Sequence, residues 1–216
     1  FLSCGNNAKF MNPSPIDTII FDLGGVLIDW NPRHLFRKLF EEEQEMEHFL
    51  EHVCTGDWNE QQDGGRPFAE AIALKTAEFP EYKPQIKAFF ERWPEMLGGP
   101  IEGTVSILER IHQEQRYRLL ALTNWSHETW PIAWERFEFL KYFEDILVSG
   151  KEKLKKPDPK IYQLLLERNG VHPEEALFID DSHRNVLAAR KEGIRTIHFT
   201  NPTALRTTLQ HFGVIG

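Results

Sequence analysis

Several short apolar runs of this chain end abruptly in side chains that can do chemistry, and the first of them leads into Asp22. Residues 19–21 are Ile, Ile and Phe, a run typical of a strand buried in a parallel sheet. Gly24 and Gly25 follow after one leucine, so a tight turn is expected just beyond the carboxylate. A carboxylate at a strand end can act as a nucleophile or as a metal ligand, and the alternative is an ordinary turn residue.

Two further apolar runs, residues 118–122 and 176–179, also end in polar side chains, and a lysine-rich segment, residues 151–156, lies between them. In a parallel sheet the carboxyl ends of the strands converge on one crevice, so these side chains are expected to meet. Taken singly, each pattern has a plain alternative, namely a turn, a solvated basic loop or an acidic helix cap. The polar side chains at these places are Thr123, Asn124, Lys156, Asp180 and Asp181.

These features have the order and approximate spacing of the four motifs of the haloacid dehalogenase-like hydrolases, a superfamily of aspartate-nucleophile phosphatases and dehalogenases. The chain resembles this superfamily from residue 16 to about residue 200. Each motif is unspecific alone, whereas four in the expected order are specific. The Asp-Leu-Gly pattern of the first motif is similar to that of sugar-1-phosphate phosphatase-like members. In chain order, the motifs are matched by Asp22, Thr123, Lys156 and the pair Asp180-Asp181.

The part of the chain after Pro100 alternates between strand-like and helix-like patterns. Such alternation is typical of an α/β fold with a doubly wound parallel sheet, and the resemblance implies the same Rossmann-like core. Helices are predicted at residues 104–113, 132–140, 160–168 and 186–190, and strands at 17–21, 118–122, 145–148, 176–179 and 194–199.

The first strand is followed by a long stretch, residues 32–99, in which only helical patterns occur. This interrupts the strand–helix alternation, so we predict a separate helical unit inserted in the core. The resemblance implies that it is a small cap over the active site. The predicted organisation is therefore an N-terminal extension at residues 1–15, an α/β core at 16–31 and 100–216, and a helical cap at 32–99.

The amino-acid composition argues against several classes of protein, including those that bind nucleic acid or span a membrane. The 216 residues suffice for one domain or for a core with a small insertion. The chain has 33 acidic and 25 basic residues, a net charge of −8, which argues against a nucleic-acid-binding surface. The two cysteines indicate neither a disulfide framework nor a zinc site, and no apolar stretch reaches the roughly 20 residues that span a bilayer. We predict a cytoplasmic protein that binds neither nucleic acid nor membranes, and its oligomeric state is left open.

The resemblance implies a Mg²⁺ site, and Mg²⁺ prefers oxygen ligands. The implied ligands are Asp22, the backbone carbonyl of Gly24 and Asp181. Asp180 would support the site, and Asn185 would orient the acidic pair. Two adjacent acids at a strand end repel each other, which itself favours a bound cation. The alternative is a solvated acidic turn in which Asp180 caps the next helix.

The resemblance also implies which groups bind the phosphate. Lys156 would be catalytic, because it places a positive charge beside both the phosphate and the nucleophile. Thr123 would offer a hydroxyl and a backbone amide to phosphate oxygens, and Asn124 would bind phosphate or the leaving group. Without the resemblance, Lys156 is one of several lysines in a solvated loop, and Thr123-Asn124 is a common turn sequence.

One position departs from the superfamily pattern. Most phosphatases of this superfamily carry a second Asp two residues after the nucleophile, which protonates the leaving alcohol, and this chain has Gly24 there. General acid–base catalysis is worth about a hundred- to ten-thousand-fold in rate. Either another group substitutes or the leaving group needs little protonation. The candidate substitutes are His127, His183, Asp57 and Asp63.

Three functions remain open from the sequence. The favoured one is Mg²⁺-dependent hydrolysis of small phosphorylated metabolites, with sugar phosphates first, through an aspartyl-phosphate on Asp22. The second is a 2-haloacid dehalogenase in which Asp22 attacks carbon without a metal, although an acidic pair disfavours a carboxylate substrate. The third is a non-catalytic binding protein, since fold alone does not prove function. Trp58 would either contact the substrate or anchor the core of the cap.

Overall fold

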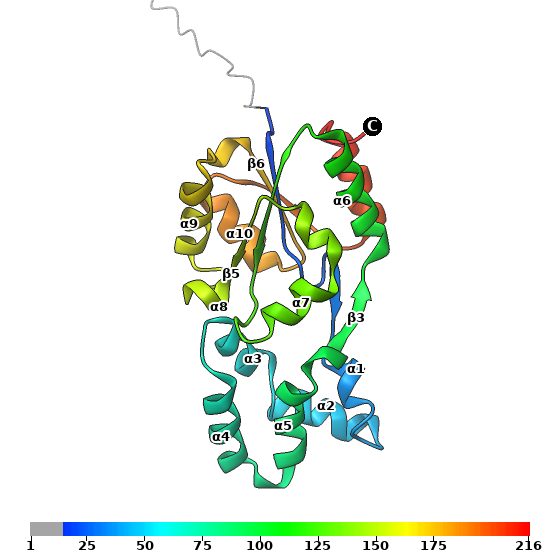
Figure 1. The fold of residues 1–216 in the computed structure, drawn as a ribbon, viewed down its shortest axis with the longest axis vertical. Coiled ribbons are helices and arrows are strands. Elements are labelled where there is room, and N and C mark those ends of the chain that lie inside the picture. Colours follow the sequence, from blue (N-terminus) through cyan, green and yellow to red (C-terminus); the bar gives the residue numbers. More distant parts are fainter. Residues whose placement is uncertain (1–14) are drawn as a thin grey trace, which may run out of the picture.

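A five-stranded parallel sheet forms the centre of the larger part of the molecule (Figure 1). The structure is a computed structural model that describes residues 15–216. The strand order is β5-β4-β1-β6-β7, so the first strand of the chain lies in the middle of the sheet. This confirms the predicted doubly wound α/β fold. The strands are β1 (Thr18–Phe21), β4 (Arg118–Thr123), β5 (Asp145–Val148), β6 (Ala176–Asp180) and β7 (Arg195–His198).

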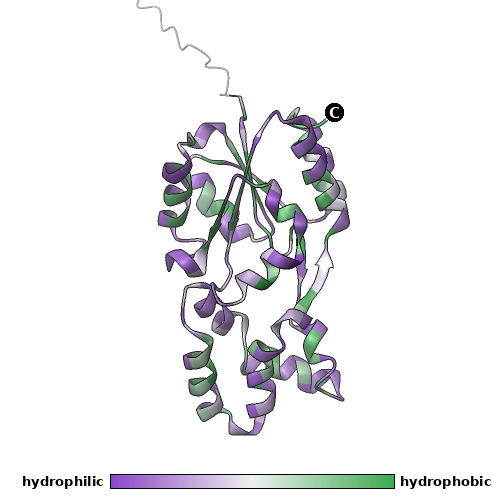
Figure 2. Ribbon diagram, viewed as in Figure 1, coloured by the Kyte–Doolittle hydropathy of each residue, from purple (hydrophilic) through white to green (hydrophobic). Residues whose placement is uncertain are grey.

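Helices cover both faces of this sheet, as the continuous apolar run of β1 requires. Ile19 and Phe21 pack in a core with α6 and α11, whereas Ile20 packs with α9 and α10 on the other face (Figure 1). Figure 2 shows the strands as the hydrophobic centre and the surrounding helices as mixed in character. The core helices are α6 (Glu102–Glu114), α7 (Trp130–Arg136), α8 (Ser149–Glu152), α9 (Pro159–Asn169), α10 (His183–Lys191) and α11 (Pro202–His211).

The register of the central strands brings three strand ends together. Phe21 pairs with Ala121 of β4 and with Ile179 of β6. The backbone N–H of Asp22 then donates to the carbonyl oxygen of Ile179 at 2.8 Å. The residue after β1 is therefore level with the ends of β4 and β6, the edge at which ligands bind in parallel α/β sheets.

A two-stranded antiparallel ribbon connects this core to a helical part of the chain. β2 (Ile28–Trp30) pairs with β3 (Leu97–Pro100), and the described segment between them contains helices and no strand. In Figure 1 these helices lie below the core, at the end of the ribbon. They are α1 (Arg33–Phe36), α2 (Glu43–His52), α3 (Gly56–Asp63), α4 (Phe68–Glu78), η1 (Pro80–Tyr82), α5 (Lys83–Glu91) and η2 (Trp93–Met96).

The helical part has an aromatic core of its own. The rings of Phe36 and Phe49 lie 4.9 Å apart, and those of Trp58 and Phe89 meet edge to face at 5.0 Å. Trp58 is only 6% exposed. Of the two roles considered for it, the contacts show a packing residue.

The structure differs from the predicted elements in several places. The predicted helix at 132–140 is α7 followed by a short 3-10 helix, η3 (Glu138–Tyr142), because Phe137 adopts an extended conformation between them. The β2–β3 ribbon and α11 were not predicted, and the predicted cap boundary at residue 99 falls inside β3. Short 3-10 turns also interrupt the helical segments at η1, η2 and η4 (Pro173–Glu175).

Some predictions are not tested by the fold. The expected N-terminal extension lies outside the described residues except for Pro15, and the division into core and cap stays a prediction. Within residues 15–216, no helix has the length and apolar character needed to cross a membrane.

The packing of Trp58 predicts its contribution to stability. We expect Trp58→Ala to lower the free energy of unfolding by about 3–5 kcal/mol, because it removes a large buried ring and leaves a cavity. Leu74 of α4 is 59% exposed, so Leu74→Ala should cost less than about 0.5 kcal/mol. Urea unfolding of both variants measures the difference, and equal losses would contradict this packing.

Candidate active site

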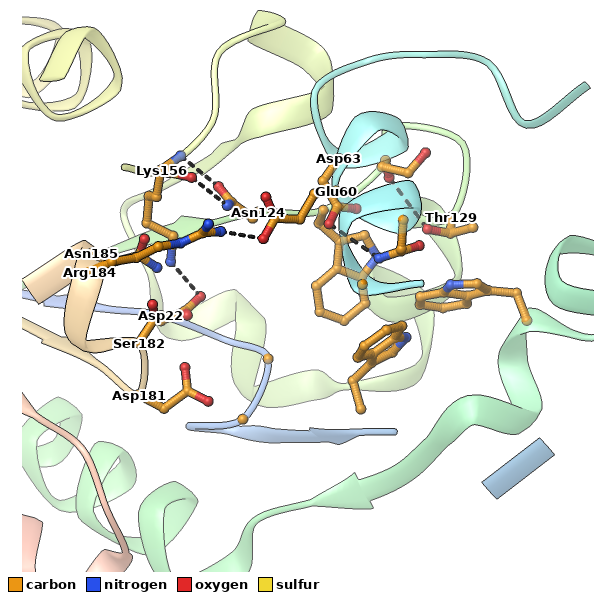
Figure 3. Close-up of a pocket in the computed structure, with 18 of the residues that line it drawn as sticks. Asp22, Glu60, Asp63, Asn124, Thr129, Lys156, Asp181, Ser182, Arg184 and Asn185 are labelled. Atoms are coloured by element: carbon orange, nitrogen blue, oxygen red, sulfur yellow. Dashed lines mark hydrogen bonds and ion pairs between the residues drawn. The ribbon is translucent and has the colours of Figure 1, made fainter. Parts of the chain in front are cut away.

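Lys156 is buried at the carboxyl edge of the sheet, and the residue is 0% exposed to solvent. Its Nζ lies 2.9 Å from Asp22 Oδ1 and 2.7 Å from Asp180 Oδ2. It also donates to the carbonyl oxygen of Leu122 at 2.9 Å. An ammonium has three hydrogens, so these three acceptors match its donors in number. Figure 3 shows Lys156 directed at Asp22.

Asn124 fixes the loop that carries Lys156. The backbone N–H of Lys156 donates to Asn124 Oδ1 at 2.8 Å, and Asn124 Nδ2 donates to the carbonyl oxygen of Lys156 at 2.9 Å. The side-chain oxygen and nitrogen of Asn124 are thus both bonded to the backbone of Lys156. Asn124 also lines the cavity described below. The contacts of Asn124 are those of a residue that positions Lys156. Its predicted role in phosphate binding stays a prediction.

The two adjacent acids at the end of β6 have different surroundings. Asp180 is fully buried, and it accepts from Asn185 Nδ2 at 3.1 Å and from the backbone N–H of Ser182 at 2.7 Å, besides Lys156. Asp181 is exposed and lines the cavity. Asn185 lies beside Asp180, and its predicted role in orienting the acidic pair stays a prediction. Asp180 is therefore held by the protein, while Asp181 is accessible to a ligand.

Three carboxylates come together at this edge of the sheet. One oxygen from each of Asp22, Asp180 and Asp181 lies within 4.8 Å of the others. Burial raises the pKa of Asp22 well above its ordinary value, and Asp180 and Asp181 raise it further, against the opposing charge of Lys156. Burial by itself would lower the pKa of Lys156, but its two acidic partners outweigh burial and the pKa is raised.

The turn after β1 passes directly under Asp181. Gly25 has a φ of +75°, and a Cβ built on it would lie 2.2 Å from Asp181 Oδ2. Both the left-handed backbone and the close approach require a glycine here. Gly24 lines the cavity, and a Cβ built on it would meet no atom within 4 Å.

A cavity of about 360 Å³ opens above these carboxylates. The core contributes Asp22, Lys156 and Asp181 to its wall, and α3 contributes residues on the opposite side (Figure 3). Residues from the helical part and from the loops around the cavity complete this wall. They include Trp30, Asn59, Glu60, Asp63, Phe68, Trp93, Trp125, Ser126, Thr129 and Arg184.

The four candidate substitutes for the acid missing at Gly24 differ in whether they line this cavity. Asp63 is one of its lining residues. Asp57, His127 and His183 are exposed and are not among them. Only Asp63, of the four, is placed where it can reach a ligand in the cavity.

Although its chain neighbour Asn124 lines the cavity, Thr123 is not among the lining residues. It is the last residue of β4 and is 1% exposed. Its Oγ1 is buried and has no hydrogen-bond partner within the described part of the chain. Such an orphaned hydroxyl costs free energy unless a ligand satisfies it.

Glu60 lines the cavity and was not predicted from the sequence. Its carboxylate forms ion pairs with Lys155, at 2.5 Å, and with Arg184, so it links α3 to two segments of the core. The local pattern around Glu60 is that of a solvated helix face, and the partners are 95 and 124 residues away. No local pattern encodes a contact of that kind.

A family model described as haloacid dehalogenase-like hydrolase matches residues 19–199. The chain belongs to this family. The matched range includes all four predicted motifs, from Asp22 to the pair Asp180-Asp181. The chain is thus a haloacid dehalogenase-like hydrolase.

Curated relatives of this hydrolase are similar at low identity. A phosphorylated carbohydrates phosphatase of Thermotoga maritima is 27% identical over 186 residues, which cover 85% of this chain and 84% of the relative. Pyrophosphatase PpaX of Bacillus velezensis is 26% identical over 190 residues, covering 86% and 84%. A phosphoglycolate phosphatase of Vibrio cholerae is 24% identical over 139 residues, covering 62% of this chain and 61% of the relative.

Solved structures agree with the family assignment. A haloacid dehalogenase family enzyme from Bacteroides thetaiotaomicron, crystallised with magnesium and inorganic phosphate, has a TM-score of 0.64 and 26% identity, covering 86% of this chain and 95% of that one. A dehalogenase has a TM-score of 0.61 at 20% identity, covering 84% of this chain and 83% of its own, and it shows the shared fold alone.

The conformation of Gly25 predicts a difference between the two neighbouring glycines. Gly25→Ala should lower the free energy of unfolding by at least about 1–2 kcal/mol, because an L residue is strained at positive φ and its Cβ would overlap Asp181. Gly24→Ala is the matched control. It should leave stability unchanged or raise it by up to about 1 kcal/mol, because the unfolded chain loses freedom. Urea unfolding compares them, and similar effects of both variants would refute this account.

Proposed function

We propose that this hydrolase is a Mg²⁺-dependent phosphatase of small phosphorylated metabolites in which Asp22 is the nucleophile. The observation that carries the proposal is the position of Asp22, held against the Lys156 ammonium at the base of a cavity, with Asp181 accessible beside it. Asp22 Oδ1 also accepts from the backbone N–H of Leu23 at 2.7 Å, which leaves Oδ2 for attack on phosphorus. An aspartyl-phosphate on Asp22 would be the intermediate.

The donor set fits a Mg²⁺ ion. The site offers three carboxylates, whose oxygens are the ligands that Mg²⁺ prefers, and these carboxylates face a single ammonium. Asp180 is occupied by Lys156 and Asn185, so Asp22, Asp181 and the carbonyl of Gly24 would hold the ion. When bound, it supplies positive charge that favours the ionised form of Asp22 and offsets the charge of a phosphate.

The remaining predicted residues have complementary tasks in this proposal. Lys156 keeps Asp22 oriented and contributes positive charge at the place where the phosphate would sit. Thr123 would donate its orphaned hydroxyl to a phosphate oxygen, and Asn124 holds the Lys156 loop in place. Asn185 keeps Asp180 turned towards Lys156.

The relatives support phosphate chemistry, and the cavity wall supports a sugar phosphate as substrate. The curated relatives include a phosphatase of phosphorylated carbohydrates. Three indole rings, those of Trp30, Trp93 and Trp125, line the cavity together with the polar side chain of Asn59. Flat aromatic faces beside hydrogen-bonding groups suit a sugar ring. We also propose that the helices between β2 and β3 act as a cap, because they provide the wall opposite Asp22.

The proposed reaction predicts phosphate release that needs both Asp22 and a divalent cation. The wild-type protein should release phosphate from a panel of phosphomonoesters with Mg²⁺, and chelation by EDTA should abolish it. Asp22→Asn should lower turnover by at least about 10³-fold, because it removes the nucleophile, while circular dichroism shows a folded protein. Halide release from 2-chloropropionate without metal, in place of phosphate release, would refute the proposal and identify a dehalogenase.

The orphaned hydroxyl of Thr123 predicts a variant that loses activity without losing stability. Thr123→Val keeps the side-chain shape and removes a buried unsatisfied group, so the free energy of unfolding should stay equal or rise. Turnover should fall about 10- to 100-fold, the value of one hydrogen bond to a charged phosphate. Thr104 of α6 is the matched control, because its Oγ1 is also buried without a described partner. Thr104→Val should leave turnover unchanged, and equal losses in both variants would contradict the role of Thr123.

A further inference from the structure

Hydrolysis of an alkyl phosphate ester needs an acid as well as a nucleophile. When Asp22 attacks phosphorus, the P–O bond of the ester breaks and its electron pair stays on the departing oxygen. An alkoxide is a poor leaving group, so a proton must reach that oxygen in the transition state. The turn after Asp22 has Gly24 and Gly25 and offers no acidic side chain. The acid must come from another part of the cavity wall.

Among residues 15–216, the core side of the cavity has no free acid for this task. Asp22 and Asp181 are the proposed nucleophile and metal ligand. The ammonium of Lys156 already donates to Asp22, to Asp180 and to the carbonyl of Leu122. These groups are committed before a substrate binds.

The opposite wall carries two acids on α3, and their surroundings differ. Glu60 forms ion pairs with Lys155 and Arg184. Burial by itself would raise the pKa of Glu60, but these two cations outweigh burial and the pKa is lowered. Glu60 is thus an ionised link between α3 and the core. Asp63 forms no ion pair among the described residues, and its carboxylate accepts a long hydrogen bond from Asn59 Nδ2, at 3.4 Å.

The position of Asp63 is fixed by its backbone. It is the last residue of α3, and its carbonyl oxygen accepts from Ser149 Oγ at 2.6 Å. The same Ser149 Oγ accepts from the backbone N–H of Trp125 at 2.9 Å, so one hydroxyl joins the end of α3 to the loop after β4. In Figure 3, Asp63 lies on the far side of the cavity from Asp22 and Asp181. In-line attack by Asp22 would place the leaving oxygen on the side of phosphorus that faces away from Asp22.

The charge state of Asp63 suits proton transfer near neutral pH. Burial, and next the charge of Glu60, raise the pKa of Asp63 from 3.8 to about 7. Lys155, the backbone amide of Ser126 and Lys156 oppose this rise. A general acid works best when its pKa is close to the operating pH.

We propose that Asp63 is the general acid and base of the reaction, supplied by the helical part of the chain in place of the residue absent at position 24. This rests on the proposed phosphatase function. The Asp63 carboxylic acid gives its proton to the ester oxygen as Asp22 forms its bond to phosphorus, which releases the alcohol. The Asp63 carboxylate then takes a proton from the water that attacks the aspartyl-phosphate, which frees phosphate, restores the Asp22 carboxylate and reprotonates Asp63.

The test uses leaving groups of different basicity. In Asp63→Asn, the rate of alcohol release in a single turnover should fall about 10²- to 10⁴-fold for the best alkyl phosphate of the panel. With p-nitrophenyl phosphate, whose phenolate leaves without help, the first turnover should change less than about fivefold. A burst of p-nitrophenol should then precede slow turnover, because water still has to be activated. Asp57→Asn, an exposed acid on the same helix, is the control and should match the wild type.

The pH profile separates proton transfer from mere positioning. Because Asp63 donates in its protonated form, wild-type alcohol release from the alkyl ester should decline as the pH rises through about 7. This decline should be missing in Asp63→Asn. Equal slowing of the alkyl and aryl esters in the first turnover, or a wild-type rate in Asp63→Asn, overturns the proposal while leaving Asp22 chemistry intact. Absence of phosphate release from the wild type would instead refute the proposed function itself.

Discussion

The Lys156 ammonium ties together the three central strands at their carboxyl ends. Its acceptors are Asp22 after β1, the carbonyl of Leu122 in β4 and Asp180 at the end of β6. Breaking a buried ion pair by removing one partner typically costs about 3–5 kcal/mol, because the other charge is left uncompensated. These contacts form only when the three strands are in register and the loop that carries Lys156 is in place. The contacts that order the sheet edge also orient the proposed nucleophile, Asp22.

This arrangement leaves the site short of positive charge. Lys156 is shared between two carboxylates, and Asp181 adds a third at the cavity. Arg184 is paired with Glu60 on the opposite wall. A phosphate brought to Asp22 would meet these carboxylates as well as the ammonium, and this electrostatic imbalance supports the proposed bound cation.

The parts of the site that the sequence predicted are those encoded locally. Each apolar run ending in a polar residue marks a strand end, and parallel strands bring such ends together, which is why Asp22, Thr123 and Asp180 could be expected to meet. Lys156 lies in the loop between α8 and α9, and it was singled out by the family resemblance. The opposite wall depends on contacts between distant segments, such as Glu60 with Arg184, which leave no local pattern. The ribbon strand β3 was missed because Leu-Gly-Gly-Pro is poor in the β-branched and aromatic residues by which strands are predicted.

That ribbon also bears on how such a chain can diversify. Ile28 pairs with Pro100 and Asp29 with Gly99, so the points where the chain leaves and re-enters the core lie side by side. A segment spliced between two adjacent strand ends can change in length or sequence without displacing β1 or α6. The sheet edge and the inserted helical segment can consequently evolve at separate rates, the first under strict geometric constraint and the second comparatively free.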